Sequence, residues 1–265
     1  MRESSRVTIP PTRVESALAD IRPALVTAVV AIPLACWIWV IAMARDMYGP
    51  MNGASAWMMT MEWDASRLLL LWAMWAAMMA GMMLPTAAPI LLLYARTVRH
   101  RPQARNPARC IYAMALGYLA VWAGFSVAAT ILQRVLARLL LLTPMMEPAT
   151  PVAAAALLLL AGVYQLTPLK AACLGVCRSP IMWLTAKWRE GVRGAFRMGL
   201  AHGLYCLGCC WAMMLLLFAG GVMNLAVILA LTIWVAVEKL APFGQQSARV
   251  SGALLIAAGT WLLLR

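Results

Sequence analysis

Charged side chains are scarce in this chain of 265 residues. Only 12% of its residues are Asp, Glu, Lys or Arg, whereas 64% are hydrophobic. A soluble globular domain has roughly half of its residues apolar and about a quarter charged, so this composition excludes a soluble enzyme and a disordered chain. Apolar runs recur along the sequence at the length of about twenty residues that a helix needs to cross a hydrocarbon core roughly 30 Å thick. The sequence therefore predicts a polytopic helical membrane protein.

Catalytic motifs are also missing. The chain contains two histidines, His100 and His202, and His100 lies in a basic loop. We find no nucleophile beside a base, no phosphate-binding loop and no cofactor fingerprint, so we assign no catalytic and no cofactor-binding residue. These absences argue against an enzyme.

Seven hydrophobic segments are predicted to cross the membrane. We expect an all-α fold, a bundle of six or seven transmembrane helices in one domain over residues 23–265, preceded by a basic cytoplasmic tail of residues 1–22. The pair Gly220-Gly221 leaves almost no loop, so the fifth and sixth segments should form a tight helical hairpin. Glu238-Lys239 ends the sixth segment, and we interpret it as a snorkelling lysine beside a surface carboxylate. The segments are 24–44, 68–94, 111–132, 152–167, 200–219, 222–237 and 250–264.

The basic residues are distributed unevenly along the chain. A net charge of +13 in a soluble protein would suggest a nucleic-acid partner, but in membrane proteins Lys and Arg collect in cytoplasmic loops. With the N-terminus in the cytoplasm, most of the 22 basic residues fall on the inner side. The sequence thus predicts a cytoplasmic N-terminus and no nucleic-acid partner. The basic residues that remain outside are Arg45, Arg67, Arg134, Arg138 and Arg265.

A basic amphipathic helix is predicted on the cytoplasmic surface. Ser179 and Pro180 are typical of a helix start, with Ser as the N-cap and Pro at the first helical position. Apolar residues, among them Trp183, then alternate with basic residues as far as Arg197. We expect this helix to lie in the interface of the inner leaflet with its tryptophans inward.

The strongest chemical signal is a histidine and three cysteines in the fifth segment. At about 100° per residue, His202, Cys206, Cys209 and Cys210 fall within roughly 100° of one helix face, and His at i with Cys at i+4 can chelate one ion. The alternative is that small cysteines merely let helices approach closely. Against it, His202 is a polar group that needs a partner in hydrocarbon. We predict a metal site here.

A second pair of thiols and a methionine stripe point to the same level of the membrane. Cys173 and Cys177 lie one helical turn apart, between Lys170 and Arg178, whose charges favour thiolates. In the second segment, Met78 and Met82 stack on one face. At 1.5 Å per residue, these thioethers reach the same depth as Cys206 and Cys210. We include all four side chains as candidate ligands, although packing alone explains many methionine stripes.

Cysteine, methionine and histidine together are soft to borderline ligands, which favour Cu(I), with Zn(II) second. A methionine-rich outer loop, residues 47–61, would suit copper capture, and an interfacial helix would explain it equally well. A membrane thiol–disulfide protein is the main alternative, because Cys206 and Cys209 form a C-x-x-C pair. The second alternative is that the protein is an accessory subunit that stabilises a larger membrane enzyme.

Three motifs resemble those of one bacterial family. They are M-M-L-P-T-A-A-P-x-L-L-L-Y-A-R at residues 82–96, C-L-x-x-C-R-S-P at 173–180 and M-G-L-x-H-G-x-Y-C-x-G-C-C-W at 198–211. The family comprises predicted metal-binding integral membrane proteins (domain of unknown function 2182), and the resemblance covers residues 68–242. It implies an inner-membrane protein and supports the cysteines and His202 as site residues. We expect a soft-metal protein that binds copper for transfer across, or delivery at, the inner membrane. Its partners would be lipid, the ion, and a membrane protein or a second copy.

Overall fold

The computed structural model describes residues 23, 25–49, 64–101, 106–143 and 146–265. The basic tail and most of the methionine-rich outer loop lie outside these residues. All the regular elements of the described chain are helices, so the predicted all-α bundle is confirmed. The elements are η1 (Thr27–Ala31), α2 (Ile32–Met47), α4 (Ala65–Met83), η2 (Pro85–Ala87), α5 (Ala88–Arg99), α6 (Pro107–Arg138), α7 (Pro151–Gln165), α8 (Pro168–Arg178), α9 (Pro180–Lys187), α10 (Gly191–Gly220), α11 (Leu225–Leu240) and α12 (Gly244–Leu264).

Several helices begin with a polar residue followed by proline. The side chains of Asn106, Thr150 and Thr167 each accept a hydrogen bond from the backbone N–H three residues further on. The proline that follows each of them occupies the first helical position, where its missing N–H costs nothing. These local signals fix where α6, α7 and α8 start.

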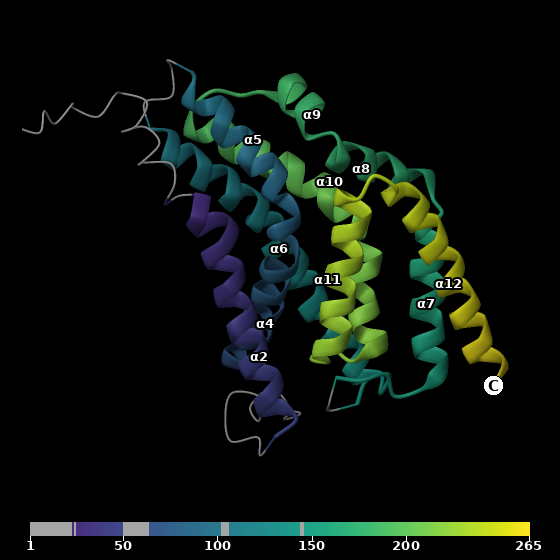
Figure 1. Ribbon diagram of the computed structural model, residues 1–265. Coiled ribbons are helices and arrows are strands. Elements are labelled where there is room, and N and C mark those ends of the chain that lie inside the picture. Colours follow the sequence, from purple (N-terminus) through teal and green to yellow (C-terminus); the bar gives the residue numbers. More distant parts are fainter. Residues whose placement is uncertain (1–22, 24, 50–63, 102–105, 144–145) are drawn as a thin grey trace, which may run out of the picture.

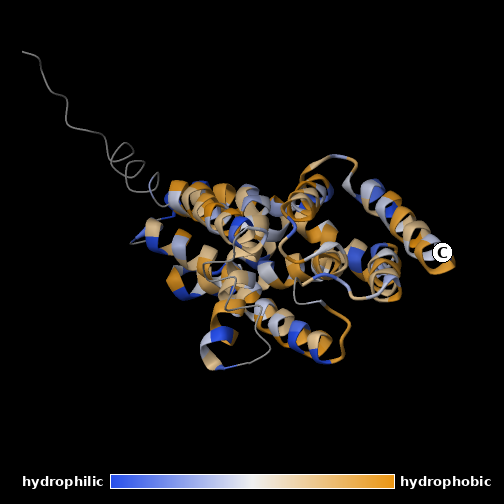
Figure 2. Ribbon diagram, turned by 90° about the horizontal axis from the view of Figure 1, so that it is seen from below, coloured by the Kyte–Doolittle hydropathy of each residue, from blue (hydrophilic) through white to orange (hydrophobic). Residues whose placement is uncertain are grey.

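Within the described residues, five helical segments are long and apolar enough to cross a membrane, and α7 with α8 makes a sixth if the pair is counted as one span bent by 65°. Helix α11 has 16 residues and runs back beside α10, as the hairpin prediction requires. Large apolar side chains such as Ile38, Leu116 and Leu254 are exposed on the outside of the bundle, where hydrophobic residues are prominent (Figure 2). These faces suit lipid.

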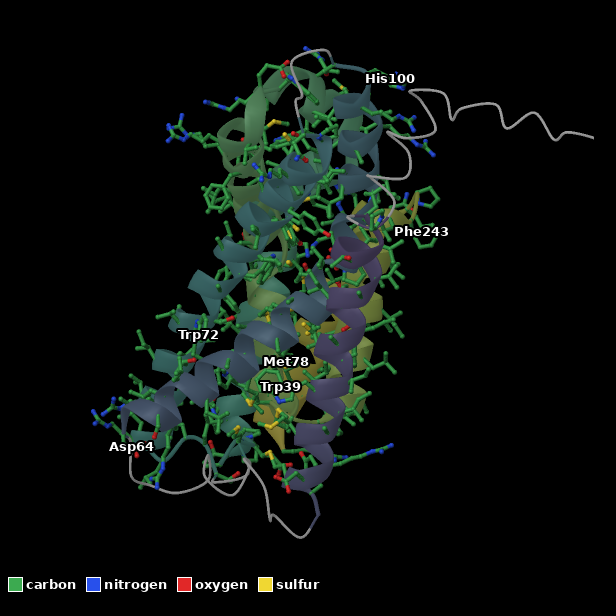
Figure 3. All side chains as sticks on the ribbon, turned by 90° about the vertical axis from the view of Figure 1, so that its left-hand side faces the viewer. Trp39, Asp64, Trp72, Met78, His100 and Phe243 are labelled. Atoms are coloured by element: carbon green, nitrogen blue, oxygen red, sulfur yellow. The ribbon has the colours of Figure 1, made fainter. Side chains whose placement is uncertain are left out.

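The turns fall at two opposite ends of the bundle. The start of α2, the end of α5, helices α8 and α9 and the α11–α12 turn lie at one end, whereas the end of α2, the α10–α11 turn and the C-terminus lie at the other (Figure 1). In the side view, His100 and Phe243 are accordingly far from Asp64 (Figure 3). This arrangement agrees with the predicted alternation of loops.

The amphipathic helix is shorter than expected. It starts at Pro180 after Ser179, as predicted, but α9 ends at Lys187. Gly191 has a φ of +73°, a left-handed conformation that favours glycine, and α10 begins there. Arg197 therefore belongs to the long helix α10 and not to the surface helix.

Helices α6 and α10 approach each other at glycines. A Cβ atom at Gly199 would lie 2.0 Å from the carbonyl oxygen of Met114, and one at Gly117 would lie 2.2 Å from that of Phe196. No side chain fits at either point, so the two backbones touch directly, as they do at small-residue contacts between membrane helices. This contact places Tyr118, the neighbour of Gly117, against α10.

We predict that Gly199→Ala destabilises the protein by about 1–3 kcal/mol, the usual cost of overpacking, because α6 and α10 must separate. Gly124→Ala in the same α6 helix is the matched control, since nothing lies within 4 Å of its Cβ position and alanine favours helix by up to about 1 kcal/mol. Thermal unfolding in detergent measures both. Equal melting temperatures for the two variants would contradict the proposed contact.

Candidate metal centre

The cysteine-rich face of α10 points into the bundle. His202, Cys206, Cys209 and Cys210 are all buried, as the helical spacing predicts. The thiols of Cys209 and Cys210 donate hydrogen bonds to the carbonyl oxygen of Cys206, at 3.1 and 2.9 Å. The four side chains therefore share one side of one helix, and the next question is what faces them.

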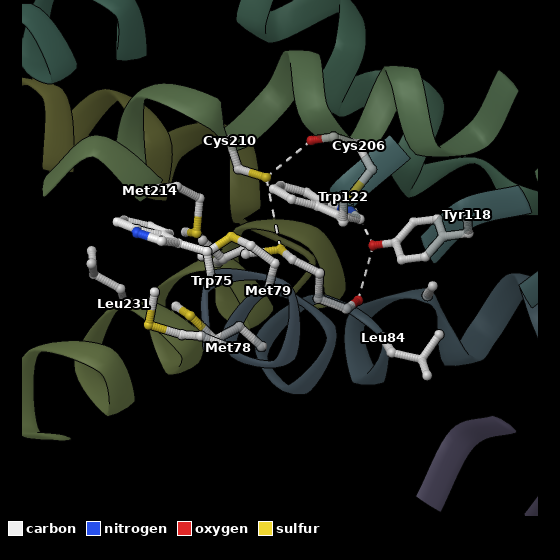
Figure 4. Packing of buried hydrophobic residues seen from close by; sticks show 14 of the residues in the cluster. Trp75, Met78, Met79, Leu84, Tyr118, Trp122, Cys206, Cys210, Met214 and Leu231 are labelled. Atoms are coloured by element: carbon white, nitrogen blue, oxygen red, sulfur yellow. Dashed lines mark hydrogen bonds between the residues drawn. The ribbon is translucent and has the colours of Figure 1, made fainter. Parts of the chain in front are cut away.

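Cys206 is the most heavily contacted thiol. Its Sγ lies 2.9 Å from the hydroxyl oxygen of Tyr118 on α6 and 2.9 Å from Nζ of Lys239 on α11. Lys239 is also 3.2 Å from Oγ1 of Thr86 and 3.8 Å from Sδ of Met83. Figure 4 shows Cys206 beside Tyr118 in the buried core, with Cys210 further along the same helix. The ammonium group of Lys239 therefore places a positive charge next to the sulfur of Cys206.

The break in the second span supplies a carbonyl to this centre. The N–H of Ala87 bonds to the carbonyl oxygen of Leu84 in the 3₁₀ turn η2, which leaves the carbonyl oxygen of Met83 without its helical partner. That oxygen accepts hydrogen bonds from the hydroxyls of Thr86 and Tyr118, at 2.8 and 2.9 Å. The kink at Pro85 therefore ties α6 to the turn that also contacts Lys239.

Helix α8 brings a second thiol into contact with α10. Sγ of Cys177 is 4.0 Å from Sγ of Cys209. Sγ of Cys173 packs directly over Gly208, where a Cβ atom would come within 2.7 Å of it. The structure thus joins Cys177 to the α10 cluster, with Cys173 at its edge.

A methionine completes the cluster, but it is not one of the two we selected. Sδ of Met83 lies 3.9 Å from Sγ of Cys210. Met78 and Met82 are buried on α4 and line, with Cys36, a small gap between α2, α4 and α11. The sequence alone did not single out Met83, since the rotation of α4 against α10 depends on the break at Pro85.

His202 lies between two aromatic rings. Tyr118 stacks on it with ring centroids 6.0 Å apart, and Trp183 of α9 meets it edge-on at 5.2 Å. Nδ1 of His202 is buried and has no hydrogen-bond partner in the described part of the chain. The imidazole therefore keeps a nitrogen free to bind an ion or a proton donor.

The sulfur spacings suit an ion with few ligands. Two sulfurs that bind one ion at about 2.3 Å each can lie up to about 4.6 Å apart, and both Cys177–Cys209 and Cys210–Met83 are closer than that. Among the described residues, however, no group of three His, Cys, Asp or Glu side chains has the geometry to hold a metal. Pairs of sulfur donors from cysteine and methionine suit Cu(I), which accepts thiolate and thioether ligands. They suit Zn(II) less well, because a structural zinc site is usually tetrahedral with four ligands.

A buried ion pair stands on the other side of α11. Nζ of Lys170 lies 2.6 Å from Oε2 of Glu238, and both side chains are at most 2% exposed. Gln165 and Trp234 donate to Oε1 of Glu238, at 2.7 and 3.0 Å. Glu238 and Lys239 are therefore not surface residues, which corrects the snorkelling interpretation. Lys170 is engaged by this carboxylate rather than by the thiols of α8.

The fold and this cluster define a class: a helical membrane protein with a cluster of sulfur side chains inside its bundle. A family model described as PpoB2, copper chaperone, matches residues 72–262, so the chain belongs to this copper chaperone family. This match is consistent with the metal-binding character expected from the motifs, and the description of the family names copper. No curated protein and no solved structure matches the chain.

We predict that Lys170→Met lowers the free energy of unfolding by about 3–5 kcal/mol, because it leaves the carboxylate of Glu238 buried and unpaired. The double variant Lys170→Met/Glu238→Gln should recover a large part of this loss. As a control, Glu190→Gln breaks an exposed pair with Arg101, which should cost less than about 1 kcal/mol. Chemical unfolding in detergent gives the three values, and a double variant no more stable than Lys170→Met would count against the ion pair.

Proposed function

We propose that this protein binds Cu(I) inside the inner membrane and delivers it to an acceptor there or passes it across. The observation that carries the proposal is a set of soft donors formed by the buried side chains of Cys206, Cys209, Cys210 and Met83 together with half-buried Cys177. Thiolates and thioethers select Cu(I) over harder ions. Membership of a copper chaperone family supports copper as the bound ion. Zinc is the second candidate ion, because cysteine and histidine also bind Zn(II).

The ligands divide into two sulfur pairs that share one helix. Cys177 and Cys209 link α8 to α10, and Met83 and Cys210 link α4 to α10. Because Cys209 and Cys210 are adjacent, a low-coordinate ion could pass from one pair to the other with a small movement. This arrangement suits transfer of the ion between partners better than permanent storage.

A cleft near His202 is the proposed point of exchange. It has a volume of about 460 Å³, is lined by Trp183, Lys187, Arg189, Arg197, Met198, Ala201 and Tyr205, and lies where α9 meets α10. Trp183 forms part of its wall and contacts the ring of His202. We propose that an ion leaves the sulfur cluster past His202 toward this end of the bundle.

Met78, Met82 and Cys36 form a second set of soft donors in the proposal. They surround one gap between α2, α4 and α11, on the side of α4 that leads toward the outer end. Met82 directly precedes Met83 in the chain. We propose that this set holds copper more weakly on its way to or from the main cluster.

A thiol–disulfide function is the second candidate, because one pair of thiols is already close. Sγ of Cys177 and Sγ of Cys209 are 4.0 Å apart, and a modest shift of α8 would bring them to bonding distance. Reversible formation of this disulfide in protein that never binds metal would favour the redox function.

We predict that the triple variant Cys206→Ser/Cys209→Ser/Cys210→Ser loses about one equivalent of copper, because serine packs similarly but ligates soft ions poorly. The protein is purified anaerobically from copper-supplemented cells, and bound metal is measured by mass spectrometry. Cys110→Ser is the control: this thiol is buried at the start of α6, away from the cluster. Unchanged copper in the triple variant would refute the site.

The same measurement of bound metal distinguishes the contribution of Met83 from those of Met78 and Met82. Met83→Leu should weaken Cu(I) binding more than Zn(II) binding, since leucine matches methionine in size and zinc rarely uses a thioether. Met78→Leu and Met82→Leu should have a smaller effect in the same direction. Met146→Leu, a buried methionine in the α6–α7 connection, serves as control. An equal loss of affinity for Cu(I) and Zn(II) in Met83→Leu would mean that Met83 contributes only packing.

The orientation is proposed from charge. The end that carries Lys187, the α5–α6 turn and α9 is rich in basic residues, and such loops stay in the cytoplasm. We predict that a cysteine introduced at Lys187, in a variant lacking the native cysteines, is labelled only after the membrane is permeabilised. One introduced at Asp64 should react from outside in intact cells. The reverse pattern would invert the topology.

A further inference from the structure

Lys239 is a buried cation without a carboxylate partner in the described chain. Its side chain is 6% exposed, and its three ammonium hydrogens face three acceptors: Sγ of Cys206, Oγ1 of Thr86 and Sδ of Met83. Two of these three are sulfurs of the proposed copper cluster. The ammonium group therefore lies in the same cage of donors that would receive a metal ion.

The neighbouring charges do not neutralise Lys239. Glu238 is the adjacent residue, but its carboxylate points to Lys170 at 2.6 Å, and that pair carries no net charge. Arg178 donates to the backbone carbonyls of Glu238 and Pro242, both at 2.8 Å. Because uncompensated charge is expensive in a low-dielectric interior, the charge of Lys239 must be balanced by whatever occupies the sulfur cluster.

We propose that Lys239 makes the sulfur cluster selective for a monovalent ion. The inference rests on the proposed function and identifies the residue that sets the ion's charge. When two thiols ligate one ion, each S–H bond breaks, a metal–sulfur bond forms and a proton leaves to water. Two thiolates and the Lys239 ammonium then sum to one negative charge, which Cu(I) cancels. A divalent ion would leave one positive charge buried in the membrane.

A third thiolate would restore neutrality for a divalent ion, but the geometry does not supply it. No three His, Cys, Asp or Glu side chains of the described residues converge on one point, whereas the thiols of Cys177 and Cys209 form a close pair. The proposal therefore counts two thiolates, those of the close pair Cys177 and Cys209, and the positive charge of Lys239 then favours an ion of charge +1 over one of charge +2.

The test compares ion selectivity and not binding alone. Full-length wild type, Lys239→Met and Lys239→Arg are titrated under anaerobic conditions with Cu(I) and Zn(II) against competing chelators, and with Ag(I) and Cd(II) as a second pair of soft ions. We expect Lys239→Met to lower the preference for the monovalent ion at least about tenfold in both pairs, and Lys239→Arg to stay within about threefold of wild type. Arg193→Met, which removes an exposed basic side chain near the start of α10, is the matched control.

Each other outcome counts against the proposal. Equal loss of affinity for both ions in Lys239→Met would mean that Lys239 only holds α11 against η2, and an unchanged ratio would mean that its charge does not act on the ion. Lys239→Gln replaces Lys239→Met if the latter does not fold, with the same expectation. A wild type that binds none of the four ions would instead refute the proposed function itself, and the selectivity role with it.

Discussion

The direct backbone contact between α6 and α10 is the constraint on which the metal centre depends. Gly117 and Gly199 remove the side chains that would hold the two helices apart, and the residue after Gly117 is Tyr118. Its hydroxyl can then reach both Sγ of Cys206 and the carbonyl oxygen of Met83. One close helix pair therefore positions three spans, because Met83 lies where α4 ends. A wider crossing would leave Cys206 facing a gap.

Helix α11 organises the other half of the molecule. It lies between the sulfur cluster and the α7–α8 bend, with Leu229 and Ile233 exposed on its outer face. Two consecutive residues contact the two sides: Glu238 pairs with Lys170, and Lys239 contacts Cys206. Because Lys170 stands on the same helix as Cys177, the ion pair also sets where α8 meets α10. The polar groups in the bundle thus position the sulfurs, while the apolar surface faces lipid.

The sequence predicted the helical bundle, the inward face of α10 and most of the sulfur residues, since these follow from hydrophobic length and from helical periodicity. It did not predict the contacts of Met83 and Lys239 with the cysteines. Both depend on contacts between helices far apart in the chain, and the rotation of α4 against α10 is set by the turn at Pro85. A lysine at the end of an apolar run is ordinarily read as snorkelling. Only the packing of α11 shows that Lys239 points inward.

The placement of neighbouring residues on α11 has a mechanical consequence. Side chains at consecutive positions of a helix diverge by about 100°, so any rotation of α11 about its axis that draws Lys239 away from Cys206 also pulls Glu238 out of its hydrogen bonds with Lys170 and Gln165. Interactions on two different sides of α11 therefore fix its rotation about its own axis. The position of the Lys239 ammonium group against Cys206 is therefore fixed in part by an ion pair on the opposite side of the same helix.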